Sequence, residues 1–484
     1  MSFNLRDYQE IGKKDIQEFI HESSHIKGVL VSPVATGKSL YPSIIAENTK
    51  GNCLIVQPNK ELLEQNVEKA RNFGLDPSIY SASAGSKDIS KLTYATPMSI
   101  AKKPEDFKHF NIVGIDECHL SMTNTYSNGK ISSKGTFNKF LDQIKPEKII
   151  GLTATPIQLV SQGFGGSELK MVNRSMRSFW YKSDIFHVTQ IPDIAQDYWA
   201  ELDIRTYDID QSALELNSNG SEFKEASVIK QYEDNGIEFR ILEKYYDLHS
   251  KGFDNILTFV PSVEQAIRLA KKNKDFEVVY DKTPAKEREA IVKAFKRGDI
   301  PHLLNVNIFT TGFDHPALKG IILGRETNSF SLFYQMCGRV CRPLIIDGNV
   351  IGKKGIIEDL TGNTKRFGSI ENITFEKNDY TNGWGMWNND RLLTGYPFGN
   401  WDMPLREDLI LKFEKKGIVN IDVQIKDIKL TFGKYKGKKL KESFEKDPRY
   451  FIWVRENFDW TKRHTRDLFQ PLNSLIEKHI AHGK

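Results

Sequence analysis

The sequence predicts an α/β protein with two tandem parallel-sheet domains and a small C-terminal α+β module. Short apolar runs alternate with amphipathic stretches from about residue 28 to 200, and the same rhythm returns from about 250 to 370. After residue 370 it stops. Strands that alternate with helices indicate a parallel sheet covered on both faces. We therefore expect domains at residues 1–200, 201–370 and 371–484.

The first series contains candidate buried strands that are each followed by turn or polar residues. They are KGVLVSP, NCLIVQP, LTYATP, NIVGIDE and KIIGLTATP. Between them, KELLEQNVEKARNFG has helical spacing, because Leu62, Leu63, Val67 and Ala70 fall on one face. This alternation predicts the first parallel sheet.

The second series has the same organisation. Its candidate strands are NILTFVP, FEVVYD, PHLLNVNIFTTG and GIILGRE, and its candidate helices are SVEQAIRLAKKN and KEREAIVKAFKRG. The polar segment QSALELNSNGSEFKEAS, between the two series, predicts an exposed connection or a helical insertion. The region after residue 370 is rich in Gly and Asn and holds five of the seven tryptophans, so we expect a separate module there.

Composition restricts the function classes. Hydrophobic residues make up 39% and charged residues 27% of the 484 residues, which is typical of a globular protein. No apolar run approaches the roughly 18 residues of a membrane span, and the N-terminus does not resemble a signal peptide. Four scattered cysteines fit a reduced compartment, and Cys337 and Cys341 lack the second pair of a zinc site. We expect a cytoplasmic protein without membrane association, and the net charge of +5 weakly favours a polyanionic partner.

The stretch VSPVATGKSL, residues 31–40, has most of a phosphate-binding loop, although Ser32 stands where a first glycine is expected. An apolar strand precedes it and a candidate helix follows, as such a loop requires. Lys38 would reach the β- and γ-phosphates, and Ser39 would bind Mg²⁺. A chance Gly-Lys-Ser turn is the alternative. The residues predicted to surround the nucleotide are Pro33, Val34, Ala35, Thr36, Gly37, Lys38 and Ser39.

An acidic pair follows another buried strand in NIVGIDECHL. Asp116 suits Mg²⁺ coordination, and Glu117 suits activation of the attacking water. A solvated Asp-Glu turn is the alternative. In GLTATPIQL, the hydroxyls around Ala154, those of Thr153 and Thr155, could bond the acidic pair and sense the nucleotide.

The motifs LRDYQ, SPVATGKS, DECH, TAT, TTGFDHP and QMCGRVCR occur in the order found in superfamily 2 helicases. The chain resembles their DEAD/DEAH-like members over residues 5–342, about 70% of its length. In that family a small residue before proline commonly replaces the first glycine, as Ser32-Pro33 does here. The resemblance implies RecA-like domains and dependence on ATP and Mg²⁺.

The resemblance also implies individual roles. Gln9 matches the adenine-reading glutamine and Arg6 the basic residue that supports it. Gly312 and Asp314 would face the ATP. Gln335, Arg339 and Arg342 would face the γ-phosphate across the cleft, with the two arginines as arginine-finger candidates. Hydrolysis would then depend on domain closure.

Further motif positions would contact the sugar–phosphate backbone without reading sequence. They are Gln57, Pro58, Asn59, Thr96, Pro97, Thr258, Thr310 and Thr311, with the loops at 258–266 and 325–329. Ordinary caps and turns are the alternative, and Ser262 is a good helix N-cap on propensity alone.

The C-terminal stretch interleaves lysines with aromatic residues in KLTFGKYKGKKL. Lys434, Lys436 and Lys438 could grip a nucleic-acid strand. The stretch resembles a small module appended to some nucleases and phage DNA-processing proteins. A solvated lysine face over an aromatic core explains this stretch equally well. A docking site for a partner protein is a further alternative.

Taken with the resemblance to phage-type helicases, these motifs imply a nucleic-acid-dependent ATPase. We expect it to unwind or remodel single-stranded, forked or branched DNA with 3′-to-5′ polarity, in a bacterial or phage-infected cell. The alternatives are an RNA-directed helicase, a motor subunit of a restriction or nuclease complex, and a nucleotide-switched clamp without turnover. An intact Glu117 and both arginines argue against the clamp.

Overall fold

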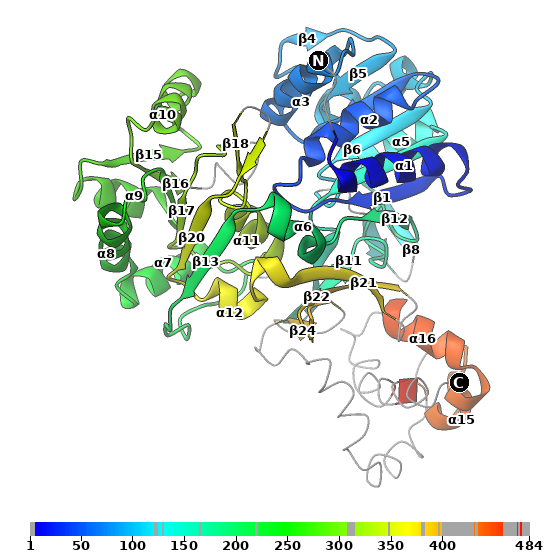
Figure 1. Ribbon diagram of the computed structural model, residues 1–484. Helices are drawn as coiled ribbons and strands as arrows, with labels where there is room; N and C mark the ends of the chain where they lie inside the picture. The colour runs from blue at the N-terminus through cyan, green and yellow to red at the C-terminus, as the bar shows by residue number, and fades with distance from the viewer. Residues whose placement is uncertain are drawn as a thin grey trace.

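The computed structural model describes most of the chain. The described residues are 5–120, 124–127, 130–163, 166–217, 221–306, 315–346, 349–378, 383–394, 397–398, 430, 434–457, 472 and 475–476. Among them, no helix is long and apolar enough to cross a bilayer. Figure 1 shows two α/β bodies side by side, with the C-terminal helices below the first.

The first domain is built on an eight-stranded sheet in the order β12-β1-β9-β6-β2-β5-β3-β4, in which only β4 is antiparallel to its neighbour. Its strands are β1 (Lys27–Val31), β2 (Cys53–Val56), β3 (Ser78–Ser81), β4 (Ser86–Lys87), β5 (Leu92–Ala95), β6 (Ile112–Asp116), β9 (Lys148–Thr153) and β12 (Asp184–Val188). Its helices are α1 (Asp7–His21), α2 (Tyr41–Glu47), α3 (Lys60–Asn72), α4 (Pro97–Ile100) and α5 (Thr136–Ile144), with 3₁₀ turns at Lys38–Leu40 and Pro104–Phe107.

Both faces of this sheet are buried. Val29 and Val31 belong to one hydrophobic cluster and Leu30 to the other, because successive side chains of a strand point to opposite faces. Parallel strands covered on both sides are expected to be continuously apolar. The five strands predicted for this domain contain β1, β2, β5, β6 and β9.

The second domain has a fully parallel six-stranded sheet in the order β13-β20-β17-β14-β16-β15. The strands are β13 (Glu201–Thr206), β14 (Ile256–Phe259), β15 (Phe276–Tyr280), β16 (His302–Val306), β17 (Gly320–Leu323) and β20 (Lys354–Asp359). The helices are α7 (Glu225–Asp234), α8 (Ile237–Ser250), α9 (Val263–Ala270), α10 (Ala285–Arg297), α11 (Phe330–Cys337) and α12 (Asn363–Phe367). Helix α6 (Ile191–Tyr198) leads into β13 from the first domain.

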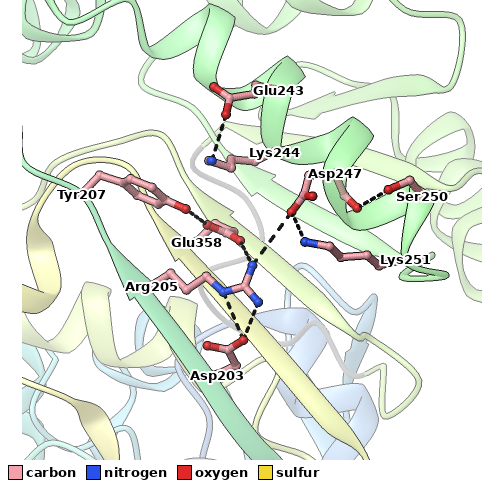
Figure 2. A network of polar contacts seen from close by, with 9 residues as sticks. All are labelled: Asp203, Arg205, Tyr207, Glu243, Lys244, Asp247, Ser250, Lys251 and Glu358. Carbon is pink, nitrogen blue, oxygen red and sulfur yellow. Dashed lines mark hydrogen bonds and ion pairs between the residues drawn. The ribbon is translucent and has the colours of Figure 1, made fainter.

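A polar network fixes the edge strand β13 (Figure 2). Glu358 of β20 is fully buried and accepts hydrogen bonds from Arg205 Nη1 at 3.0 Å and from the Tyr207 hydroxyl at 2.6 Å. The guanidinium of Arg205 also pairs with Asp203 at 2.6 Å and lies 4.0 Å from Asp247 of α8. These contacts tie the first strand after the interdomain connection to its neighbour and to a covering helix.

Residues after α12 return to the first domain. Strands β21 (Ile373–Asn378), β22 (Gly383–Asn388) and β23 (Arg391–Leu392) form one antiparallel sheet. Strand β24 (Pro397–Phe398) pairs with β11 (Gly166–Met171), which pairs with β10 (Ile157–Gly163). The Gln190 carboxamide donates to Phe375 O at 2.5 Å and accepts from Phe375 N at 3.1 Å. The chain therefore crosses between the two domains a second time (Figure 1).

The remaining described elements are small. They are the hairpins β7 (Asn124–Ser127)–β8 (Lys130–Lys134) and β18 (Leu344–Ile346)–β19 (Asn349–Ile351), a 3₁₀ turn at Ile370–Asn372, and helices α15 (Leu440–Lys446) and α16 (Pro448–Asn457). The two C-terminal helices enclose their own hydrophobic cluster, which includes Leu440, Phe444, Phe451 and Val454. Phe444 and Phe451 are the buried aromatic residues of this cluster, and Tyr435 and Tyr450 pack against it.

Candidate active site

The loop after β1 is held in shape by its own side chains. The Ser32 and Thr36 hydroxyls lie 2.7 Å apart, and Thr36 Oγ1 donates to Pro33 O at 2.6 Å. The backbone turns at Ala35 and Gly37, which have φ of +63° and +77°. Ser32, which replaces the expected glycine, is thus a bonded part of the loop.

The N-terminal helix α1 bonds to the same loop. Gln9 Nε2 and the Tyr8 hydroxyl each donate to Thr36 O at 2.9 Å, and the Arg6 backbone N–H donates to Gln9 Oε1 at 3.0 Å. An added Cβ at Gly37 would lie 2.7 Å from Gln9 Nε2, so glycine permits this close approach. The predicted adenine reader therefore contacts the phosphate loop directly, and Tyr8 is a partner that the motif analysis missed.

Lys38 forms ion pairs with both acidic residues at the end of β6. Its ammonium contacts Asp116 and lies 3.0 Å from Glu117 Oε1. Burial opposes its charge, but the two carboxylates outweigh burial and raise the pKa of Lys38. Burial likewise opposes the charge of Glu117, but Lys38, His119 and Arg339 together lower the pKa of its carboxyl group. Both groups are therefore charged at neutral pH.

The residues predicted to couple nucleotide and motor lie between the loop and the acidic turn. His119 Nδ1 is 2.8 Å from Thr153 Oγ1 and 3.4 Å from Glu117 Oε2. Thr153 Oγ1 also accepts from Thr155 N at 2.9 Å, and Thr153 O accepts from Ser32 N at 2.9 Å. Thr153 thus joins β9 to both parts of the site, with Ala154 buried beside it. Burial lowers the pKa of His119, which keeps its imidazole neutral.

Helix α11 brings the second domain to the loop. An added Cβ on Gly338, at the end of α11, would lie 2.6 Å from Val34 Cβ. The neighbouring Arg339 is buried, and its charge lowers the pKa of Glu117. The charge of Arg342 acts instead on Cys341 and Lys353. Arg339 follows the end of α11 directly, and Gln335 lies half-buried on α11.

Helix α3 supplies two further residues that the motif analysis missed. Lys69 Nζ donates to Ser39 Oγ at 2.6 Å, and Asn66 Nδ2 donates to Asp116 Oδ2 at 3.4 Å. Of these two residues, only Asn66 could have been noticed in the sequence, because it is a polar residue within the apolar face of α3. Ser39 and Asp116 offer the oxygen ligands that Mg²⁺ prefers, and such sites are commonly completed by substrate phosphates. The site therefore fits Mg²⁺ together with a nucleotide.

Several predicted backbone-contact residues are placed differently. Gln57 and Thr258 are fully buried, and Thr258 Oγ1 lies 2.7 Å from His302 Nε2. Neither side chain is exposed in this arrangement, and their predicted contact with a nucleic-acid strand stays a prediction. The side chain of Asn59 caps α3, and Thr96 is 8% exposed with its hydroxyl 2.8 Å from Ser99 Oγ.

Other predicted positions stay accessible or lie elsewhere. Pro58 is half-buried, and Pro97 begins α4. Thr310, Thr311, Gly312 and Asp314 lie outside the described residues. Lys434, Lys436 and Lys438 are exposed, and Lys434 Nζ donates to Asp447 Oδ2 at 3.0 Å.

Cysteines take no part in a metal centre within the part of the chain that the structure describes. All four, Cys53, Cys118, Cys337 and Cys341, are buried and free. No cluster of three or more potential ligands is found among the described residues.

Three family models match this chain. Residues 2–158 match "Type III restriction enzyme, res subunit", residues 238–343 match "Helicase conserved C-terminal domain", and residues 430–459 match "Exodeoxyribonuclease X-like C-terminal". The putative ATP-dependent helicase IRC3 of Saccharomyces cerevisiae is 27% identical over 49% of this chain and 32% of its own length. A 51.5 kDa protein of a Lactococcus phage (isolate 7-9) is 24% identical over 65% of this chain and 62% of its own length. The chain thus spans between about a third and two thirds of the length of these relatives.

Solved structures share the fold. The type ISP restriction-modification enzyme LlaBIII bound to DNA aligns with a TM-score of 0.53 at 15% identity, over 76% of this chain and 28% of the enzyme. A fragment of a putative HsdR subunit of a type I restriction enzyme from Vibrio vulnificus YJ016 aligns with a TM-score of 0.55 at 18% identity, over 76% of this chain and 67% of the fragment. Together with the family models, the two parallel-sheet domains confirm the resemblance to superfamily 2 helicases and their RecA-like fold.

Proposed function

This chain has the paired RecA-like domains of superfamily 2 helicases, and we propose that it is a nucleic-acid-stimulated ATPase that moves along DNA. One observation carries the proposal. Lys38, Asp116 and Glu117 meet at the strand ends of the first domain, and Gly338 of the second domain, which directly precedes Arg339, packs against Val34 of the phosphate loop. A phosphate-binding lysine, a carboxylate pair and an arginine from across the cleft are the parts of a phosphoryl-transfer site.

The chemistry follows from these contacts. Triphosphate oxygens draw the Lys38 ammonium away from the carboxylates, which leaves Glu117 free to orient the attacking water and accept its proton. Arg339 stabilises the charge that develops on the transferred phosphoryl group. Bound Mg²⁺, held by Ser39 and Asp116, supplies charge neutralisation for the phosphates. Because Arg339 comes from the second domain, hydrolysis requires closure of the two domains.

The proposed substrate is forked or branched DNA, on which the motor moves with 3′-to-5′ polarity. The match of residues 430–459 to an exodeoxyribonuclease C-terminal family supports a DNA substrate, and so do the exposed lysines Lys436 and Lys438 beside that module's core. The resemblance of the motifs to phage-type helicases is the basis on which we include a role in DNA replication, recombination or repair.

The test is ATP turnover against matched amounts of single-stranded DNA, duplex DNA, a four-way junction and single-stranded RNA. Lys38→Ala serves as the blank, and Glu117→Gln should bind ATP and DNA without turnover. Stimulation that is strongest with the junction supports the proposal, and stimulation by RNA alone overturns the substrate. Strand displacement from duplexes with a 3′ or a 5′ single-stranded tail then decides the polarity.

A second candidate is the motor subunit of a restriction complex. It is favoured by the match of residues 2–158 to a restriction-enzyme res subunit and by the fold shared with two restriction enzymes. Such a motor moves along intact duplex DNA. Turnover stimulated by linear duplex, with displacement of a triplex strand but no strand separation, would favour this candidate.

A further inference from the structure

Helix α3 borders the site beside Ser39 and Asp116. Asn66 and Lys69 lie three positions apart and therefore on one face of the helix. Lys69 donates to Ser39 Oγ at 2.6 Å and Asn66 donates to Asp116 Oδ2 at 3.4 Å. One helix face thus contacts both side chains that suit Mg²⁺. The side chain of Asn66 is only 2% exposed, although burying an amide group costs more free energy than leaving it in solvent.

The two contacts differ in charge. Asn66 is neutral and orients the Asp116 carboxylate, whereas Lys69 brings a positive charge to an oxygen that has no charge of its own. Ser39 Oγ accepts from Lys69 through the lone pairs with which a hydroxyl coordinates a metal ion. Lys38 is already paired with Asp116 and Glu117, so Lys69 adds a positive charge beside the position that the nucleotide phosphates require.

We infer that Lys69 is a built-in cation of the phosphate site, which holds Ser39 in the absence of Mg²⁺ and releases it when the metal binds. The inference rests on the proposed nucleotide-binding function. In the metal-free protein, the Lys69 ammonium attracts the phosphates and so retains a nucleotide that has lost its metal. When Mg²⁺ is present, the metal ion and the Lys69 ammonium compete for the same side of the site. The contribution of Lys69 to nucleotide affinity then largely disappears.

The experiment measures binding of a fluorescent ADP analogue, so that turnover plays no part. Affinity is determined in EDTA and at saturating Mg²⁺ for wild type, Lys69→Met and Lys69→Arg. Lys293→Met is the matched control, since Lys293 is an exposed lysine on α10 that pairs with Glu289. Lys69→Met should lose at least about fivefold in EDTA and less than about twofold with Mg²⁺, because a unit charge about 4 Å away contributes about that factor even in bulk water and more near a protein surface. Lys69→Arg should retain the affinity of the wild type in EDTA.

Each other outcome overturns the inference. An equal loss in EDTA and in Mg²⁺ would make Lys69 a permanent phosphate ligand, and no loss in either would make its contact purely structural. Lys69→Gln provides a second variant should the methionine disturb folding. Failure of wild type to bind ADP at any Mg²⁺ concentration would remove the proposed function itself, which separates that failure from a loss confined to Lys69.

Discussion

Replacing Gly338 with alanine should slow ATP turnover without weakening ATP binding. The new Cβ would lie 2.5 Å from Val34 Cγ2 and 2.6 Å from Val34 Cβ, about 1 Å inside normal contact between carbon atoms. Overpacking of this kind costs about 1–3 kcal/mol. Because Gly338 and Val34 belong to different domains, the cost falls on the closed arrangement that brings Arg339 to Glu117. An effect of that size shifts the balance between closed and open domains by roughly 5- to 150-fold.

The assay is DNA-stimulated ATP turnover with kcat and KM determined separately. The kcat should fall within that range while KM for ATP changes little, because Lys38 and Gln9 bind within the first domain. Gly352→Ala is the control, since an added Cβ there meets nothing within 4 Å. An unchanged kcat in Gly338→Ala, or the same decrease in Gly352→Ala, would refute the reasoning. Partial recovery in Gly338→Ala with Val34→Ala would identify the clash itself as the cause.

Three further predictions concern other parts of the molecule. Arg339→Ala should lower turnover far more than Arg342→Ala, with ADP affinity unchanged in both, because Arg339 directly follows Gly338, which packs against Val34 of the phosphate loop; equal losses would show that neither arginine alone is the finger. Burial raises the pKa of the Glu326 carboxyl group from 4.5 to about 8. The contribution of this group to the stability of the folded protein is therefore fully present below pH 4.5 and is lost as the pH rises to about 8. Glu326→Gln should therefore raise the melting temperature at pH 8.5 and leave it nearly unchanged at pH 4, since each pKa unit corresponds to about 1.4 kcal/mol; a parallel shift at both pH values would contradict this assignment. Replacing Lys436 and Lys438 together with glutamine should reduce the slope of log affinity against log salt by about 1.4 to 1.8 if both contact DNA phosphates, whereas an unchanged slope would indicate a solvated lysine face.

The repeating elements could be predicted from the sequence because buried parallel strands are continuously apolar. Strand β1 (Lys27–Val31) and helix α9 (Val263–Ala270) lie where the apolar runs and spacing indicate. Ser262, expected as a cap on propensity, does accept from Gln265 N as the N-cap of α9. Strand β3 was missed because its four residues, Ser78–Ser81, are short and largely polar.

The site was predictable only where one motif holds its own partners. Within the phosphate loop, Thr36 bonds to Ser32 and Pro33 of the same motif. Lys38 and the acidic pair come from two motifs and meet as the order of those motifs implies, so a recognised motif order extends what can be predicted. Lys69 and Asn66 reach the site through packing of a helix against a distant loop, which local spacing does not encode. Motif position does not predict exposure either: Thr258 is fully buried, because successive side chains of a strand point to opposite faces of the sheet and both faces are covered here.

The second crossing of the chain between the domains has a mechanical consequence. One connection runs through α6 into β13, and the other returns from α12 to β21, where Gln190 bonds to Phe375. A body attached to another at two points can swing about the line that joins them but cannot easily translate or twist. A protease that cuts the connection at α6 leaves two polypeptides without a covalent link, but the pairing of β24 with β11 still attaches the second domain to the first, so a nicked protein should copurify as one unit. The two connections therefore restrict how the domains can separate, and the contact that separation must break first lies between Val34 and Gly338.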